Sequence, residues 1–147
     1  MLKLASKKSS AVPHKKTKAK IGILEMDRRW YQSAKRVICM EFEVDSISLQ
    51  DILFNNIDIG NYHSILVYYG IEYEAIDISA TLDLISIIKN FSANPPALLL
   101  ITDYADSQIT AEAHSYLPQI DGVFAKDQEL ALLLKILKVI DKPKCFY

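Results

Sequence analysis

Five residues that could carry or prevent chemistry come one or two positions after four short apolar runs, at positions 21–24, 64–67, 97–101 and 122–125. They are Glu25, Met26, Tyr68, Thr102 and Lys126. Short apolar runs are typical of buried strands, and an open parallel sheet binds its ligands at the carboxyl ends of its strands. A carboxylate, a hydroxyl and an amine that meet there could bind a metal ion or a phosphate group. Tyr68 does not fit this chemistry, because a phenol with a pKa of about 10 is almost wholly protonated at neutral pH.

The elements that would position these residues alternate along the chain. The patterns predict strands over residues 20–25, 42–44, 64–69, 97–101 and 122–125, and helices over 27–38, 49–55, 79–91, 107–116 and 128–140. Asp27 is a plausible N-cap of the first helix, and the continuous apolar run 97–101 suits a central strand that is covered on both faces. We therefore expect an α/β fold, a doubly wound five-stranded parallel sheet with helices on both faces.

Length and composition indicate one domain with flanking tails. A chain of 147 residues that is 50% hydrophobic can bury a substantial core. Residues 1–20 contain seven lysines, no acid and few large apolar side chains. We expect a basic disordered tail over 1–19, the domain over 20–141 and a short tail over 142–147. Because no secretory or bilayer-spanning apolar run is present, the sequence predicts a cytoplasmic protein.

Several classes of enzyme are disfavoured by what surrounds the strand ends. A nucleotide-binding enzyme would place a glycine-rich loop after the first strand, whereas residues 26–30 read Met-Asp-Arg-Arg-Trp and the four glycines are not clustered. His14, His63 and His114 have no serine, cysteine or acid partner at a recognisable spacing. Cys39 and Cys145 form no disulfide framework. We expect no catalytic residue, no cofactor and no enzymatic activity.

Glu25, Thr102 and Lys126, in this order at the ends of the first, fourth and fifth strands, resemble the receiver domains of bacterial two-component response regulators. The resemblance covers residues 20–140 and implies the flavodoxin-like three-layer sandwich of that family. In the family, the first strand ends in two acids that hold Mg²⁺. The third strand ends in the aspartate that accepts the phosphoryl group, and the fifth ends in a lysine followed by proline.

Three replacements separate this chain from that pattern. Met26 occupies the position of the second acid, Tyr68 that of the acceptor aspartate, and Asp127 that of the proline. Phosphoryl transfer needs a carboxylate nucleophile and Mg²⁺, and Mg²⁺ prefers oxygen to a thioether. The resemblance therefore implies a degenerate phosphoacceptor pocket without a metal. Its residues are Glu25, Met26, Tyr68, Thr102 and Lys126. Asp27 and Asp103 could support a weak metal site, although Asp27 suits a helix cap better.

Lys126 then needs a different anionic partner. An amine in a partly buried pocket without an anion is unfavourable, and we expect Glu25 to pair with it. Many receivers also carry an aromatic residue three positions before the lysine. Here that position is Val123, and strand alternation turns Phe124 to the other face. These features favour a fixed conformation over a switch.

Without a working phosphoacceptor pocket, we expect the protein to act through contacts of its surface with other proteins. The family forms dimers and binds its targets through the fourth helix, the fifth strand and the fifth helix, here 107–116, 122–125 and 128–140. The last helix has more apolar residues than one buried stripe uses. The expected interaction surface comprises Val123, Phe124, Leu132, Ile136, Val139 and Ile140. We expect a phosphorylation-independent receiver-like signalling or regulatory domain that binds a protein partner and forms a homodimer.

Two alternatives remain open. The first is a nucleic-acid or membrane-surface adaptor that uses the lysines of residues 1–20 as an anchor. The second is a regulatory fragment of a larger transcriptional regulator. Salt-dependent binding to DNA or anionic vesicles that is lost with residues 1–20 would separate the adaptor from a protein-binding domain.

Overall fold

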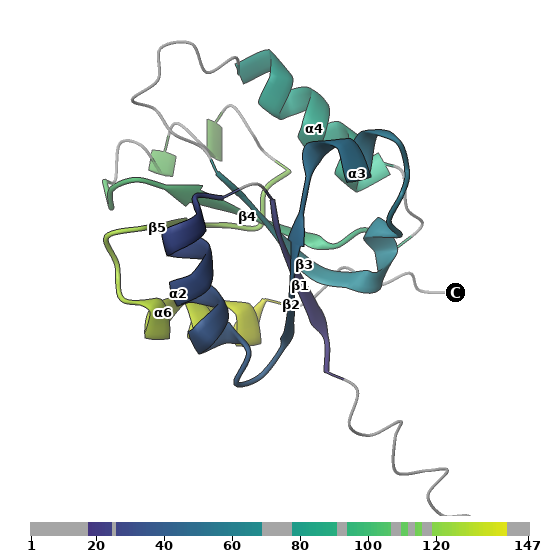
Figure 1. The fold of residues 1–147 in the computed structure, drawn as a ribbon. Helices are drawn as coiled ribbons and strands as arrows, with labels where there is room; N and C mark the ends of the chain where they lie inside the picture. The colour runs from purple at the N-terminus through teal and green to yellow at the C-terminus, as the bar shows by residue number, and fades with distance from the viewer. Residues whose placement is uncertain are drawn as a thin grey trace, which may run out of the picture.

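The structure, a computed structural model, describes residues 18–24, 26–68, 78–90, 94–106, 110–111, 114–115 and 119–140, with the backbone alone for 78–82. The strands in this part of the chain are β1 (Lys20–Leu24), β2 (Glu43–Ile47), β3 (Tyr62–Tyr68), β4 (Ala97–Thr102) and β5 (Gly122–Ala125). The helices are α2 (Arg28–Ile38), α3 (Leu49–Leu53), the 3-10 helix η1 (Ile59–Asn61), α4 (Ile78–Asn90) and α6 (Leu130–Val139). Strands and helices alternate, as the sequence predicts (Figure 1).

All neighbouring strands are parallel, in the order β2-β1-β3-β4-β5. The register aligns Leu24 with Ile47 and Val67, and Tyr68 with Ile101. The carboxyl ends of β1, β3, β4 and β5 therefore meet at one edge of the sheet. This edge is where the sequence places its candidate site.

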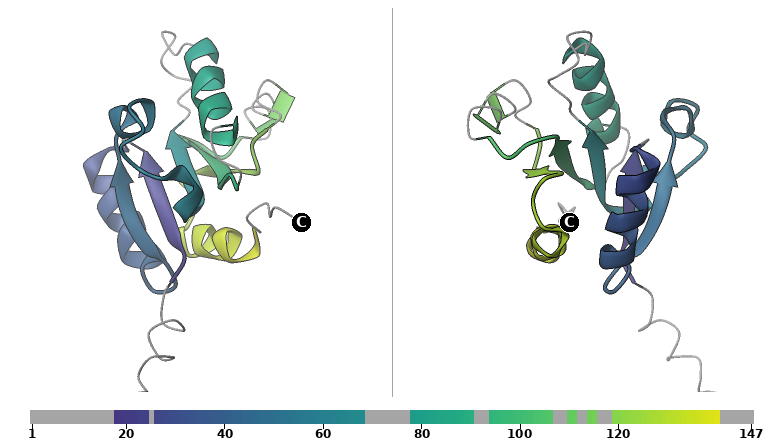
Figure 2. Two further views of the ribbon diagram at one scale, coloured as in Figure 1. Left: turned by 90° about the vertical axis from the view of Figure 1, so that its right-hand side faces the viewer. Right: turned by 60° about the vertical axis from the view of Figure 1, so that its left-hand side comes forward.

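Two apolar clusters sandwich the sheet. One cluster includes Ile52 of α3 and Ile85 and Ile88 of α4, and the other includes Ala34 of α2 and Leu133 of α6. Accordingly, α2 and α6 lie on one side of the sheet and α4 lies on the other (Figure 2). Each residue of β4 is buried, which confirms the central strand predicted from the run 97–101. The result is the three-layer α/β fold expected from the sequence.

Local sequence sets the helix starts. Asp27 accepts a hydrogen bond from the Trp30 backbone N–H and is the N-cap of α2. Ser48 and Asp51 form a capping box at the start of α3. At α6, by contrast, Glu129 occupies the N-cap position without a side-chain hydrogen bond, and the helix begins at Leu130, two residues later than predicted.

Two strand boundaries differ from the prediction by two residues or more. The second strand runs to Ile47, three residues past the predicted end, because all five residues from Glu43 pair with β1. The third strand begins at Tyr62, directly after the turn that Asp58 caps. Of the predicted helix 107–116, only residues 110–111 and 114–115 are described, and they are helical.

An ion pair joins α4 to the amino ends of β4 and β5, on the side of the sheet opposite to the carboxyl ends of the strands. Lys89 Nζ lies 2.9 Å from Asp121 Oδ2 and donates to the Pro96 carbonyl at 3.2 Å. The same Asp121 oxygen accepts the Leu98 backbone N–H at 2.7 Å. One carboxylate thus joins the end of α4 to the starts of β4 and β5.

Candidate functional site: the carboxyl edge of the sheet

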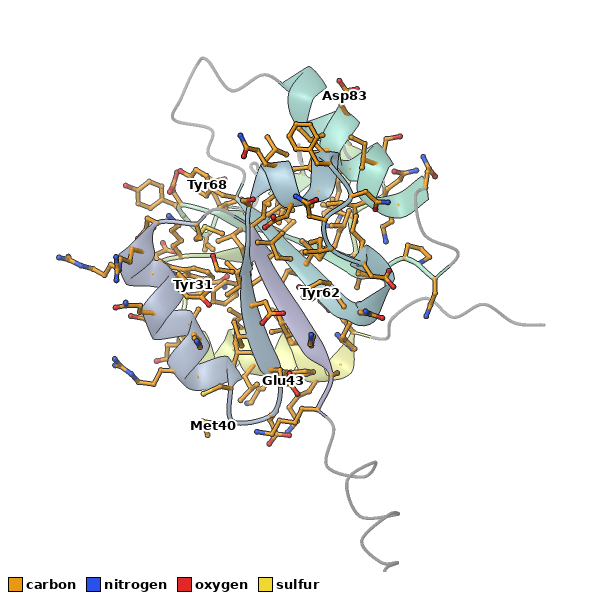
Figure 3. The ribbon with its side chains drawn as sticks, turned by 45° about the vertical axis from the view of Figure 1, so that its right-hand side comes forward. Tyr31, Met40, Glu43, Tyr62, Tyr68 and Asp83 are labelled. Atoms are coloured by element: carbon orange, nitrogen blue, oxygen red, sulfur yellow. The ribbon has the colours of Figure 1, made fainter. Side chains whose placement is uncertain are left out.

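Four of the five predicted pocket residues lie at the carboxyl edge of the sheet. Tyr68 ends β3, Thr102 ends β4, and Met26 and Lys126 follow β1 and β5. Tyr68 and Tyr62 lie at opposite ends of β3 (Figure 3). Glu25 lies outside the described residues.

Tyr68 is hydrogen-bonded to an acid that directly follows the neighbouring strand. Its hydroxyl lies 2.7 Å and 2.9 Å from the two carboxylate oxygens of Asp103 and donates to that group. Asp103 comes directly after β4, the strand that pairs with β3. The end of β3 therefore carries a phenol that is bonded to a carboxylate from the end of β4.

Lys126 contacts the same tyrosine from β5. Its Nζ lies 4.5 Å from the Tyr68 ring centroid and donates to Asp27 Oδ2 at 2.8 Å. Within the described residues, Lys126 thus pairs with Asp27, whereas Glu25, the partner predicted from the sequence, lies outside them. Asp27 reaches Lys126 because it caps α2 at the edge where Lys126 emerges.

Asp27 has two roles where the sequence suggested one. It caps α2 and also forms the ion pair with Lys126. The hydrogen bond from Lys126, followed by that from the Trp30 backbone, holds the pKa of Asp27 below its ordinary value. Its side chain is 53% exposed, so solvent screens the pair.

Backbone contacts fix the ends of β4 and β5. The Lys126 N–H donates to the Thr102 carbonyl at 2.7 Å, and the Ala105 N–H donates to Asp127 Oδ1 at 3.0 Å. The buried Thr102 hydroxyl donates to the Tyr104 carbonyl at 3.2 Å. Asp127 thus binds the loop after β4.

The donors that the structure describes at this edge do not by themselves fit Mg²⁺. Asp27 is paired with Lys126, Asp103 accepts the Tyr68 phenol, and Met26 packs against the apolar cluster between α2, α6 and the sheet. Within the described ranges, no group of three or more His, Cys, Asp or Glu side chains could hold a metal ion. A hard cation would have to displace Lys126 and the phenol to reach two carboxylates.

A cavity of about 300 Å³ adjoins this edge. It is lined by Thr102, Ala105, Asp106, Thr110, Val123, Ala125 and Gln128. Val123 packs toward the cluster of α3 and α4, whereas Phe124 is fully buried in the cluster of α2 and α6. The strand alternation predicted for these two residues is therefore confirmed.

The predicted interaction surface is only partly exposed. Leu132 is 39% exposed and Val139 is 77% exposed. Phe124 is buried, so its place on this surface was wrong, because its side of β5 is covered by α2 and α6. Ile136 and Ile140 are half-buried and pack in part against the same cluster.

Sequence reasoning missed the partner of Tyr68. Asp103 was considered only as a metal ligand, although β3 and β4 are adjacent and Asp103 follows the end of β4. The strand order implied by the fold would have placed the two side chains together.

No protein-family model matches this sequence, and no curated protein matches it. Solved structures do resemble the fold. A response regulator from Thermotoga maritima superposes with a TM-score of 0.63 at 15% identity, over 82% of this chain and 95% of that chain. The receiver domain of DrrB activated with BeF3 gives 0.61 at 14% identity, over 83% and 96%.

A structure of CheY6 from R. sphaeroides in complex with the P1 domain of CheA3 gives 0.60 at 19% identity, over 84% of this chain and 99% of that chain. None of the helices in the described part of the chain is long and apolar enough to cross a membrane. The five parallel strands, their order and these superpositions together show that the chain has the CheY-like fold of response-regulator receiver domains.

Proposed function

We propose that this chain is a receiver-like signalling domain that acts through protein contacts, without aspartyl phosphorylation and without catalysis. The observation that carries the proposal is the side chain at the end of β3. Tyr68 places a phenol there, which donates to Asp103 while Lys126 covers its ring. The receiver fold supports the signalling part of the proposal.

The contacts at this edge support the proposal that no carboxylate here accepts a phosphoryl group. An acyl phosphate forms on a carboxylate oxygen, with a metal ion to neutralise the developing charge. The carboxylates nearest the end of β3 in the described structure, Asp27 and Asp103, are already bonded to Lys126 and Tyr68. The same bonds hold the edge in one arrangement.

The test is the intact mass of the chain after incubation with acetyl phosphate and Mg²⁺. We expect no added phosphoryl group. A stable gain of one phosphoryl group that is removed by hydroxylamine would overturn the proposal. The variant Tyr68→Asp should also remain unmodified, because Met26 still supplies no oxygen, whereas Met26→Asp combined with Tyr68→Asp restores two carboxylates to the edge.

The protein contact most compatible with the structure is a homodimer through α6. Leu132 and Val139 are exposed and seven residues apart, so they lie two turns apart on one face of the helix. Ile136 lies between them and is half-buried. Burying such side chains contributes about 1.5–3 kcal/mol each before the entropy of association.

Sedimentation velocity tests the dimer with a matched control. The variant Leu132→Glu with Val139→Glu adds two charges to the exposed face of α6 and should dissociate the dimer without unfolding the domain. The control, Leu53→Glu with Phe54→Glu, adds two charges at the end of α3, where both side chains are also exposed. A wild-type monomer at high concentration, or equal dissociation by both variants, would contradict a dimer through α6.

A further inference from the structure

The chain concentrates its arginines on a single helix. Its only three arginines are Arg28, Arg29 and Arg36, and all lie on α2. All three side chains are exposed, as are those of Gln32 and Lys35. Because α2 has no acidic residue, these residues form a basic stripe on its outer face, and the cations from Arg28 to Arg36 span about 12 Å of helix axis.

This stripe contrasts with the rest of the domain. Seven of the 17 Lys and Arg residues lie in residues 1–20, and all 18 Asp and Glu residues lie after them. The part of the chain from residue 21 onward is therefore acidic overall. A basic face on an acidic domain produces a field that attracts a polyanion to one side of the molecule.

The arginines have no ion-pair partner in the described structure that would explain them. None of the salt bridges in the described residues involves an arginine. Arg29 does act electrostatically on Asp27, but the Asp27 carboxylate is bonded to Lys126. Arg28 and Arg29 also occupy the first turn of α2, where the helix dipole disfavours cations.

The described chain begins beside the other end of this stripe. Lys18 Nζ donates at 3.1 Å to the carbonyl of Cys39, the C-cap residue of α2. Lys18 thus lies beside the last turn of α2, which carries Lys35 and Arg36, whereas Arg28 and Arg29 lie in the first turn.

We infer that the stripe of Arg28, Arg29, Lys35 and Arg36 binds the phosphate backbone of a nucleic-acid duplex, independently of the function proposed above. Guanidinium groups match phosphate oxygens in a bidentate geometry. A duplex fits better than a single strand, because the aromatic residues of α2 offer no open stacking platform. Trp30 and Tyr31 pack against the core, and Lys35 lies 5.9 Å from the Tyr31 ring centroid. A membrane surface fits less well, because the exposed residues between these cations include no large apolar side chain to insert.

Fluorescence anisotropy of the full chain with a labelled 20-base-pair DNA duplex, at several KCl concentrations, tests this inference. Four phosphate contacts by the stripe contribute about −3.6 to the slope of log K against log salt, a loss on the order of 100-fold between 50 and 200 mM KCl, and contacts by the lysines of residues 1–20 would add to this slope. Replacing all three arginines (Arg28→Gln, Arg29→Gln, Arg36→Gln) should weaken binding by roughly 10-fold or more at 50 mM KCl and reduce the slope by about 2.7.

Two matched variants identify the source of any loss. Lys135→Gln with Lys138→Gln removes two exposed cations from α6 and should change affinity by less than about 2-fold. Replacing the three arginines by lysine preserves the charge and should retain the salt slope. The inference is overturned if the triple glutamine variant binds like the wild type, if the α6 variant loses as much affinity, or if vesicles with anionic headgroups bind more tightly than the duplex. Circular dichroism of each variant should show an unchanged fold.

Discussion

Lys126 lies over the ring of the tyrosine whose hydroxyl is bonded to Asp103. The Lys126 Nζ atom is 4.5 Å from the Tyr68 ring centroid, and the Tyr68 hydroxyl is 2.7 Å from an oxygen of Asp103. One side chain thus contacts a cation with its ring and an anion with its hydroxyl. These two contacts can be removed separately.

Replacing Tyr68 by phenylalanine removes only the hydrogen bond. We expect Tyr68→Phe to lower the free energy of unfolding by about 0.5–1.5 kcal/mol, because Asp103 loses its donor. Tyr68→Leu should lower it further, by about 0.5–1 kcal/mol, because the contact between the ring and Lys126 is also lost. Urea unfolding measures both changes. Tyr104→Phe, at a side chain that is 57% exposed, should stay within about 0.5 kcal/mol of the wild type.

The ion pair between Asp27 and Lys126 should depend on pH in a defined direction. The pKa of Asp27 is lowered from 3.8 in the folded state, so its contribution to stability is present above that value and is lost as the pH falls through the lowered pKa. Asp27→Asn retains a side-chain cap but removes the charge. The difference in unfolding free energy between wild type and Asp27→Asn, measured from pH 7 to pH 2, should be constant near neutrality and disappear at the acid end.

Most of the fold could be predicted from the sequence, but less of the site. The apolar run 97–101 predicted a buried central strand, and the apolar spacing around Ala34 and Ile38 predicted the buried face of α2. Strand pairing lengthened β2, which no local pattern could show. The partners at the site depend on the strand order, because Asp27 and Asp103 each lie on a different element from the residue that they bind.

The exposure of apolar side chains on α6 illustrates the same limit. The sequence shows eight apolar residues in this helix but not how far the neighbouring helix α2 covers them. Contact with the cluster under α2 half-buries Ile136 and leaves Val139 exposed. Exposure at the edge of a helix therefore depends on packing between elements that are distant in sequence.

The contribution of Tyr62 to stability should depend on pH in the alkaline range, as that of Asp27 does in the acid range. Burial, followed by its hydrogen bond to Asp45 at 3.0 Å, raises the pKa of Tyr62 to about 12. Because the folded pKa lies above that of the unfolded chain, the stability from this group is complete below about pH 10 and is lost as the pH rises toward 12. Spectrophotometric titration should show one phenol ionising last, and Asp45→Asn should lower its pKa. The late ionisation should be absent in Tyr62→Phe.

Asp121 should be the acid whose removal most weakens the junction of α4 with β4 and β5. Asp121→Ala leaves Lys89 without its ion pair and Leu98 N–H without its acceptor. We expect a loss of about 1.5–3 kcal/mol in unfolding free energy, since the lost hydrogen bonds involve a charged group. Asp83→Ala on the same helix, at an exposed side chain, is the control and should change stability by less than about 0.5 kcal/mol. Equal losses in the two variants would show that the junction contributes nothing specific.

The bond between Asp27 and Lys126 joins residues that are 99 positions apart. Such a contact cannot form until the intervening strands have assembled, because closing so long a loop early would cost entropy with little compensation. It should therefore be absent from the folding transition state and act on the rate of unfolding alone. In stopped-flow measurements, Asp27→Asn should accelerate unfolding and leave the refolding rate unchanged, so this bond governs how long the domain stays folded rather than how quickly it folds.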